Sequence, residues 1–184
     1  MEQGKSNGAN IVLMGMPGSG KSTVGLLLAE KLKMGYLDID CQIEEKFSLS
    51  IADLFLKHGE QFFREVETET VIYSSQQKNM VIATGGGVVM KEINMVHLRK
   101  TGIIIYLKRS CADILKTADL SKRPLLASHT EKIYQLYGQR KGLYERYADI
   151  TINNENSLEM AADYICEVLY ETNGDKWTQL KSIR

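Results

Sequence analysis

A glycine-rich segment at residues 15–22 constrains the fold of this chain more than any other feature of its sequence. It reads GMPGSGKS and matches the pattern G-x-x-x-x-G-K-[ST] of a phosphate-binding loop. The apolar run at 10–14 before it is typical of a buried strand, and apolar residues follow it with helical spacing between 24 and 32. Strand, glycine loop and helix are the context that this motif requires, whereas a plain glycine turn does not need Gly-Lys-Ser at the helix start.

The loop predicts a binding site for a nucleoside triphosphate. Its glycines allow successive backbone N–H groups to converge on phosphate oxygens, and the helix after it adds its positive dipole end. In such loops the lysine, here Lys21, reaches the β- and γ-phosphates, and the hydroxyl of Ser22 is suited to Mg²⁺. We therefore expect ATP as co-substrate and Mg²⁺ as cofactor. The expected nucleotide-binding residues of the loop are Gly18, Ser19, Gly20, Lys21, Ser22 and Thr23.

Composition limits the partners that this chain can have. Its 184 residues are 43% hydrophobic, which suits one domain with a full core. The 23 basic and 23 acidic residues cancel, so no electrostatic case exists for long nucleic acid or an anionic membrane, and any anion site is local. Three widely spaced cysteines favour reduced thiols, and the sequence contains neither a signal peptide nor an apolar stretch of membrane-spanning length. We expect a cytoplasmic monomer that acts on small molecules.

Short apolar runs alternate with helical patterns along the chain. The runs lie at 11–14, 36–39, 81–84, 103–107 and 150–152. Because these runs are apolar on both faces, they predict a parallel sheet that is covered by helices on both sides. We expect one α/β domain at 10–170, a disordered tail at 1–9, and a C-terminal tail at 171–184 where apolar periodicity is lost.

Two aspartates end the second apolar run, in Asp38-Ile39-Asp40. If the strand reaches residue 40, its alternation points both carboxylates the same way, at the edge of a parallel sheet where ligands bind. One carboxylate can then serve a metal ion through its water shell, and the other can accept a hydrogen bond from a substrate hydroxyl. The alternative is that Asp40 only N-caps a helix beginning at Cys41. The neighbouring phosphate loop favours chemistry.

Arg64 and Glu67 lie in a long helical pattern that begins near residue 59. Their spacing of three makes them neighbours on one helix face. A carboxylate in this position can hold a guanidinium in a fixed pose and leave its other edge free for a ligand. Taken alone, such a pair is more often a surface ion pair of little energetic value, so it gains meaning only together with the other motifs.

A triple glycine, Gly85-Gly86-Gly87, follows the apolar run at 80–84. Three glycines leave a strand end without side chains, so that a substrate can approach the backbone and bind its N–H groups. The alternative is a flexible turn between strand and helix, but a turn rarely needs three glycines.

Two further arginines are candidates for anion binding. Arg123 lies in the polar segment SKRPLL between two helical patterns, where a mobile loop can bring it to phosphates; an exposed basic loop is the alternative. Arg140 shares an apolar helical stripe with Ile133 and Tyr144. An inward guanidinium is costly unless it is paired. Arg140 therefore predicts an internal carboxylate or a bound anion, unless it snorkels at the edge of the stripe.

Taken together and in this order, the motifs resemble the shikimate kinase family over most of residues 10–170. They are the glycine loop at 15–23, D-x-D at 38–40, F-R-x-x-E at 63–67, the triple glycine at 85–87, RPLL at 123–126 and RKGLY at 140–144. The resemblance implies a P-loop fold like that of nucleoside monophosphate kinases, a three-layer α/β/α sandwich with a five-stranded parallel sheet. It also implies a lid at about 112–126.

The resemblance further implies an activity and a set of residue roles. The reaction would be transfer of the γ-phosphate of ATP to the 3-hydroxyl of shikimate, giving 3-phosphoshikimate and ADP for aromatic amino acid biosynthesis. The implied catalytic residues are Lys21, Asp40 and Arg123; the metal ligands are Ser22 and Asp38; Lys116 and Arg123 join the nucleotide site; and the substrate site consists of Asp40, Arg64, Gly85, Gly86, Gly87 and Arg140.

The chain departs from the family pattern at several places, among them 91–95, where the family's R-x-x-N-R is only partly kept. Gly142 stands where proline is usual, and on the adenine side Lys116 and the segment 154–156 stand where arginines are common. Two other functions compete with this one. Another small-molecule kinase, acting on gluconate or a nucleoside monophosphate, should lack the triple glycine together with Arg64 and Arg140. A nucleotide-binding regulator without catalysis would bind ATP but transfer no phosphate.

Overall fold

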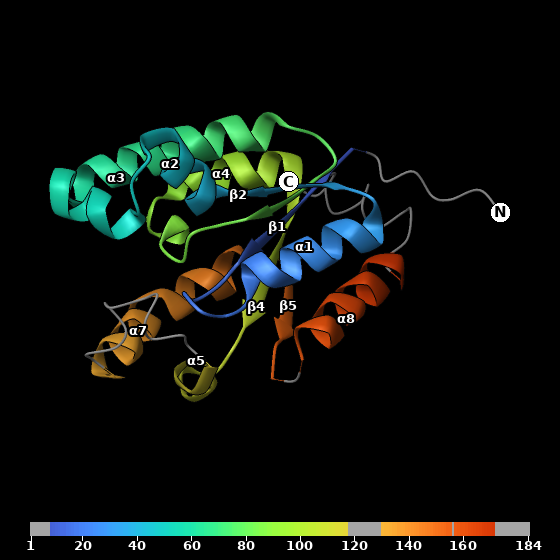
Figure 1. The fold of residues 1–184 in the computed structure, drawn as a ribbon. Helices are drawn as coiled ribbons and strands as arrows, with labels where there is room; N and C mark the ends of the chain where they lie inside the picture. Colours follow the sequence, from blue (N-terminus) through green and yellow to red (C-terminus); the bar gives the residue numbers. More distant parts are fainter. Residues whose placement is uncertain (1–7, 118–129, 156, 172–184) are drawn as a thin grey trace.

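The computed structural model describes residues 8–117, 130–155 and 157–171. Its five strands form one parallel sheet in the order β2-β3-β1-β4-β5. The strands are β1 (Asn10–Met14), β2 (Gly35–Asp38), β3 (Met80–Ala83), β4 (Gly102–Lys108) and β5 (Ile150–Asn153). The helices of the described ranges are α1 (Lys21–Leu32), α2 (Ile39–Phe47), α3 (Ile51–Gln76), the 3₁₀ turn η1 (Val88–Met90), α4 (Glu92–Thr101), α5 (Cys111–Thr117), α7 (Thr130–Tyr147) and α8 (Leu158–Glu171) (Figure 1).

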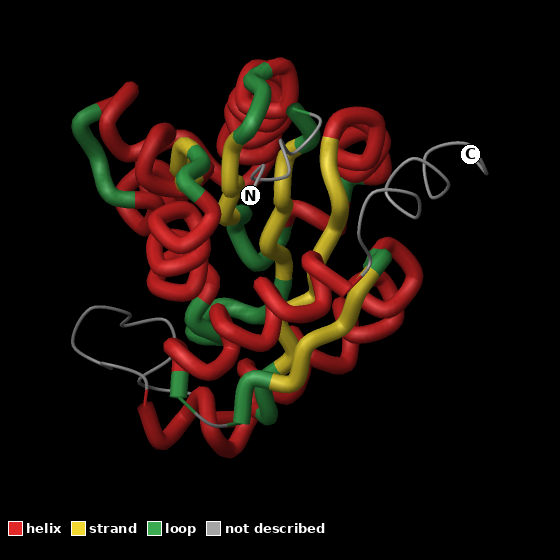
Figure 2. The backbone as a smooth tube through the Cα atoms, turned by 90° about the vertical axis from the view of Figure 1, so that its right-hand side faces the viewer, coloured by secondary structure: helices red, strands yellow, loops and turns green. Residues whose placement is uncertain are grey.

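Helices cover both faces of the sheet, so the predicted three-layer α/β/α sandwich is confirmed (Figure 2). Alternate side chains of β1 enter two separate cores. Ile11 and Leu13 pack with apolar residues of α1 and α8, whereas Val12 and Met14 pack with those of α2, α3, α4 and α7. Burial on both faces is the reason why the strands read as continuous apolar runs.

The five predicted strands are confirmed, but the end of the second differs. β2 ends at Asp38, and α2 begins at Ile39, because the Asp38 carboxylate caps that helix. Asp38 Oδ1 accepts hydrogen bonds from the backbone N–H groups of Asp40 (3.0 Å) and Cys41 (3.3 Å). Both expectations for Asp40 are therefore wrong in detail, since it neither continues the strand nor caps the helix. It lies in the first turn of α2.

The long helical pattern after residue 50 forms a helix in two segments. Ser50 caps α3 by accepting a hydrogen bond from the N–H of Asp53 at 3.1 Å. The helical path breaks at Gly59, whose φ of 81° and ψ of 169° suit glycine alone. The second segment then carries Arg64 and Glu67 on one face, as the sequence predicts.

Because all strands run the same way, the segments that follow them meet at one edge of the sheet. The glycine loop follows β1, Asp38 ends β2, and the triple glycine follows β3. Arg109 follows β4, and Asn154 follows β5. Residues far apart in sequence are thereby gathered at the edge where open α/β sheets bind ligands.

Parts of the predicted tails and lid lie outside the described residues, including 1–7, 172–184 and Arg123. The last two residues of the expected N-terminal tail belong to the fold, since Ala9 is buried and the carbonyl of Gly8 accepts from the N–H of Asn79 at 3.3 Å. The expected lid begins inside α5, whose Ile114 is buried in the core. In the described ranges, no helix is both long and apolar enough to cross a membrane.

A buried asparagine joins the start of β1 to the segment between α3 and β3. Asn10 donates from Nδ2 to the Gln77 carbonyl (2.7 Å) and accepts at Oδ1 from the N–H of Met80 (3.0 Å). We expect Asn10→Ala to lower the free energy of unfolding by about 2–4 kcal/mol, because both backbone groups lose their partner. Urea denaturation measures this loss. Lys78→Ala, which changes an exposed residue of the same segment, serves as control, and an equal loss in both variants would contradict the expectation.

Candidate active site

The glycine loop is closed by its own lysine. Lys21 is only 7% exposed, and its ammonium donates to the carbonyls of Gly15 (3.0 Å) and Met16 (2.8 Å). The N–H of Ser19 also donates to the Met16 carbonyl at 3.1 Å, which closes a turn. Gly18 and Gly20 adopt left-handed φ angles of 82° and 92°. The loop thus wraps around the start of α1 in the way that phosphate binding needs.

Ser22 and Asp38 bring two side-chain oxygens together beside the loop. The hydroxyl of Ser22 donates to Asp38 Oδ2 at 2.7 Å. The Tyr36 hydroxyl lies 3.2 Å from the same carboxylate oxygen and 3.2 Å from the Ser22 carbonyl. Burial and the negative charge of Asp38 raise the pKa of Tyr36. It therefore remains a hydrogen-bond donor at neutral pH.

Asp40 lies between the glycine loop and the triple glycine. Burial, and then the negative charge of Asp38, raise its pKa to about 6, although Lys21 acts in the opposite direction. A carboxylate with this pKa is a stronger base than an ordinary aspartate and is still largely ionised at pH 7. The two aspartates of the D-x-D motif thus lie at one place, although they come from different elements.

Each glycine of the triple glycine contacts a different functional group. A Cβ on Gly85 would lie 2.6 Å from Asp40 Oδ1, and one on Gly86 would lie 2.6 Å from Pro17 Cδ. A Cβ on Gly87 would lie 2.5 Å from Arg64 Nη1. A side chain at Gly86 would meet the rigid ring of Pro17, and one at Gly85 or Gly87 would displace the Asp40 carboxylate or the Arg64 guanidinium. A flexible turn does not account for them.

Arg64 is held by a buried carboxylate. Its Nη1 donates to Glu67 Oε2 at 2.7 Å, and Glu67 is 1% exposed. Burial raises the pKa of Glu67, while the charge and hydrogen bond of Arg64 lower it. The ammonium of Lys91 donates to the backbone carbonyl of Arg64 at 3.1 Å. The pair is therefore no ordinary surface ion pair, because both the guanidinium and its backbone are fixed.

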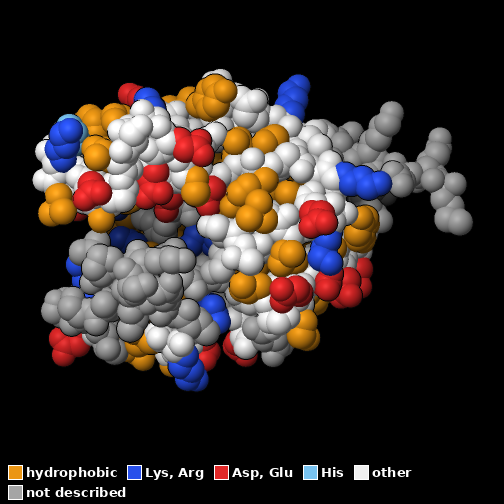
Figure 3. Space-filling view, in the orientation of Figure 1, with side chains coloured by type: hydrophobic (Ala, Val, Ile, Leu, Met, Phe, Trp, Pro, Cys, Tyr) orange, Lys and Arg blue, Asp and Glu red, His pale blue; other side chains and the backbone are white. Residues whose placement is uncertain are grey.

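Arg140 faces the same site from α7. Its Nη1 donates to the Gly86 carbonyl at 3.2 Å, and the Tyr144 hydroxyl donates to the same oxygen at 2.5 Å. The Nε of Arg140 is buried without a hydrogen-bond partner, and no described carboxylate forms an ion pair with this arginine. Of the options that the sequence leaves open, a bound anion suits this arrangement best. Basic side chains are visible in the hollow beneath the lobe formed by α2 and α3 (Figure 3).

The structure gathers most predicted site residues but not all of them. Lys116 is on α5 with its side chain 73% exposed, and its ammonium pairs with Asp113 at 3.1 Å. Thr23 is exposed on the first turn of α1. Arg123 lies outside the described residues. Nothing in the described contacts brings Lys116 to the loop.

Four residues that are not among the predicted site residues contact the predicted ones. They are Tyr36, Lys91, Arg109 and Asn154. Tyr36 precedes Asp38 by two positions on β2, so both side chains share one face of the sheet. Arg109 and Asn154 directly follow strands. A search for polar residues at strand ends would have found them.

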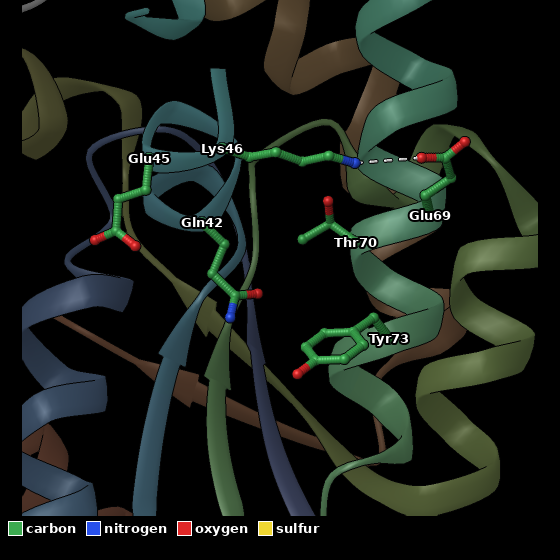
Figure 4. Close-up of a pocket in the computed structure, with 6 residues that line it drawn as sticks. All are labelled: Gln42, Glu45, Lys46, Glu69, Thr70 and Tyr73. Atoms are coloured by element: carbon green, nitrogen blue, oxygen red, sulfur yellow. Dashed lines mark ion pairs between the residues drawn. The ribbon is translucent and has the colours of Figure 1, made fainter. Parts of the chain in front are cut away.

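A separate groove of 580 Å³ lies between α2 and α3. Its lining side chains are Gln42, Glu45, Lys46, Glu69, Thr70 and Tyr73, and Lys46 pairs with Glu69 at 3.5 Å across it (Figure 4). None of the predicted site residues lines this groove, so it is distinct from the site described above.

Comparison with known proteins identifies one family. The model of the family described as shikimate kinase matches residues 17–170. A shikimate kinase of Clostridium botulinum (strain Eklund 17B / Type B) is 39% identical over 159 residues, which are 86% of this chain and 96% of that protein. A shikimate kinase of Caldanaerobacter subterraneus subsp. tengcongensis is 41% identical over 169 residues, covering 90% of this chain and 98% of the relative.

Comparison with solved structures agrees with the sequence comparison. The shikimate kinase from Acinetobacter baumannii in complex with shikimate superposes with a TM-score of 0.85 at 34% identity, over 91% of this chain and 96% of that one. The Mycobacterium tuberculosis APS kinase in complex with AMPPNP and APS has a TM-score of 0.55 at 15% identity, over 89% of this chain and 98% of that one. The second likeness shows a shared fold alone.

The raised pKa of Asp40 predicts a pH-dependent stability in buffer with EDTA. Since the folded pKa of about 6 exceeds the ordinary value of 3.8, the folded chain binds more protons than the unfolded chain between pH 4 and 6. The stability that Asp40 contributes therefore falls as pH rises through this window. We expect Asp40→Asn to be more stable than the parent at pH 7 by about 3 kcal/mol and to lose this advantage near pH 4. Urea denaturation across this range measures it.

The control for this experiment is Glu45→Gln, which changes an exposed carboxylate of the same helix. Its stability difference from the parent should stay small and change little with pH. A difference between Asp40→Asn and the parent that is the same at pH 4.5 and pH 7 would contradict the assignment of the raised pKa.

Proposed function

The chain belongs to the shikimate kinase family, and we infer that it transfers the γ-phosphate of ATP to the 3-hydroxyl of shikimate. The products are 3-phosphoshikimate and ADP. The observation that carries the residue assignment is the triple glycine, whose three positions contact Asp40, the glycine loop and Arg64. Membership of this family favours shikimate over gluconate or a nucleoside monophosphate as acceptor. The intact Lys21, Ser22 and Asp38 argue against a regulator without catalysis.

The acceptor half of the site binds a small hydroxylated carboxylate. Arg64 and Arg140 hold the shikimate carboxylate. Glu60 and Glu67 fix Arg64, the Gly86 carbonyl holds Arg140, and each guanidinium has more N–H groups than these hydrogen bonds use. Gly85, Gly86 and Gly87 let the ring lie against the backbone. Asp40 then accepts a hydrogen bond from the 3-hydroxyl.

The donor half binds the triphosphate and neutralises the charge that develops during transfer. Lys21 leaves the carbonyls of Gly15 and Met16 and moves to the β- and γ-phosphates. The 3-hydroxyl oxygen attacks the γ-phosphorus in line, the bond to the bridging oxygen of ADP breaks, and Asp40 takes the hydroxyl proton. If the transition state is loose, this proton moves late and Asp40 mainly orients the hydroxyl. Arg123, outside the described residues, approaches the phosphates from the lid.

Ser22 and Asp38 fit Mg²⁺, because they offer hydroxyl and carboxylate oxygens 2.7 Å apart beside the loop. Ser22 would bind the ion directly and Asp38 through its water shell. Bound Mg²⁺ supplies positive charge to the β- and γ-phosphate oxygens. Tyr36 contacts Oδ2 of Asp38 while the capping bonds use Oδ1, so contacts to both oxygens keep the orientation of the carboxylate.

The remaining proposals concern the protein as a whole. The catalytic domain spans 10–170, which the match of the family model to 17–170 supports. Zero net charge supports an enzyme of small molecules without nucleic acid or membrane partners. We propose a cytoplasmic monomer. For Lys116 to reach the nucleotide, its ammonium must first leave Asp113.

Arg140→Ala tests the acceptor assignment. In a coupled assay of ADP release, we expect kcat/KM for shikimate to fall about 100-fold, because a charge-assisted bidentate contact is lost, while the KM for ATP changes little. Arg146→Ala, an exposed arginine of the same helix, is the matched control and should behave like the parent. Equal loss of ATP binding, together with a lowered melting temperature, would assign Arg140 to folding instead. No stimulation of the parent enzyme by shikimate would reject the function.

Tyr36→Phe tests the support of the metal site. The variant keeps the ring but loses the hydroxyl that contacts Asp38, so we expect the Mg²⁺ concentration for half-maximal activity to rise about fivefold or more. Binding of Mn²⁺ in the presence of ADP, followed by electron paramagnetic resonance, should weaken in parallel. Tyr73→Phe, an exposed tyrosine on α3, is the control. Unchanged Mn²⁺ affinity would show that the hydroxyl does not support the metal site.

A further inference from the structure

The backbone carbonyls of the glycine loop are held by groups from several elements. Lys21 binds the carbonyls of Gly15 and Met16, and the N–H of Val24 donates to the Gly20 carbonyl at 2.9 Å. The remaining contacts come from strand ends. Arg109 Nη1 lies 3.4 Å from the Gly18 carbonyl, and Asn154 Nδ2 donates to the Ser19 carbonyl at 2.8 Å. The shorter of these two bonds fixes the middle of the loop.

The surroundings of Asn154 direct its side chain toward the Ser19 carbonyl. Its side chain is 1% exposed, and its backbone N–H donates to the Lys108 carbonyl at 2.8 Å, which ties it to the end of β4. Its Oδ1 is buried without a hydrogen-bond partner. The amide must present its N–H₂ group to Ser19, because two carbonyl oxygens at this distance would repel each other. Burying an amide with one unsatisfied atom costs free energy. The hydrogen bond to Ser19 is the side-chain contact that offsets this cost.

The bond determines the direction of a neighbouring N–H group. In a trans peptide the C=O of one residue and the N–H of the next point in opposite directions. Holding the Ser19 carbonyl at Asn154 therefore turns the Gly20 N–H the other way. The side chains of Asn154 and Leu158 pack closely against Gly20 itself, since a Cβ there would lie 3.2 Å from Asn154 Nδ2 and 2.5 Å from Leu158 Cδ2. In loops of this kind such N–H groups bind the phosphates.

We propose that Asn154 is a positioning residue for the nucleotide, which aims the Gly20 N–H at the phosphates before the ligand arrives. The loop then loses its conformational entropy during folding and not during binding. This role does not involve the adenine base, although Asn154 lies in the segment that the family resemblance places on the adenine side. It rests on the proposed use of ATP by the loop.

Asn154→Leu removes the donor at nearly constant volume, and Asn153→Leu is the matched control at the exposed neighbouring position. Isothermal titration would measure ADP, tripolyphosphate and shikimate as ligands. For Asn154→Leu we expect ADP and tripolyphosphate to bind about tenfold more weakly, by a similar factor, because both use the loop. Shikimate affinity should stay within about twofold in both variants. Asn154→Ser, which keeps a hydroxyl donor on a smaller side chain, should give an intermediate loss and guards against a variant that does not fold.

Other outcomes would overturn the proposal. Weaker ADP binding with unchanged tripolyphosphate binding would mean that Asn154 contacts the base. A similar loss for all three ligands, together with a lowered melting temperature, would mean a structural role only. Unchanged nucleotide binding would mean that the loop is aimed without Asn154. The experiment measures ligand binding and not turnover. A result that contradicts the role of Asn154 therefore leaves the assignment of shikimate as acceptor intact.

Discussion

The parallel direction of the five strands is the constraint on which the site depends. Parallel pairing brings the ends of β1, β2 and β3 to one edge, so the glycine loop, Asp38 and the triple glycine meet although some 70 residues separate the first from the last. Such pairing requires helical crossovers. Two of these crossovers begin with functional residues, since α1 starts at Lys21 and α2 starts beside Asp38.

Buried charge gives the acceptor site its chemistry. Burial raises the pKa of Glu67, and the positive charges of Arg64, Arg140 and Lys91 act in the opposite direction. Arg140 has a backbone carbonyl as partner and keeps a buried Nε unpaired. A carboxylate ligand is the kind of partner that this guanidinium lacks among the described residues. The site is therefore organised for an anion before the anion binds, and this preorganisation is the usual source of affinity and of transition-state stabilisation.

The sequence predicts those parts of the fold and site that depend on local pattern. The strands, the glycine loop and the inward side of Arg140 follow from apolar runs and from helical spacing. The position of Asp40 does not, because the cap formed by Asp38 ends β2 two residues earlier than alternation suggests. Asn154 is not predicted because its partner is a backbone carbonyl 135 residues away in sequence. Tyr36 is close to Asp38 in sequence, but its second partner is the distant backbone carbonyl of Ser22. Residue pattern carries no signal for such contacts beyond their place at strand ends.

The donor and acceptor halves meet at Gly86, and the Tyr144 hydroxyl of α7 also lies 4.0 Å from Met16 Sδ of the glycine loop. Its Cα packs against Pro17 of the glycine loop so closely that a Cβ would lie 2.6 Å from the ring. Its carbonyl accepts hydrogen bonds from Arg140 and Tyr144. A shift of the glycine loop therefore cannot leave Arg140 unmoved, because both are in contact with one short backbone segment that has no side chain to absorb the change. The reacting hydroxyl and the γ-phosphate must meet within bonding reach, and a backbone link between their two binding sites fixes that separation more firmly than side chains could.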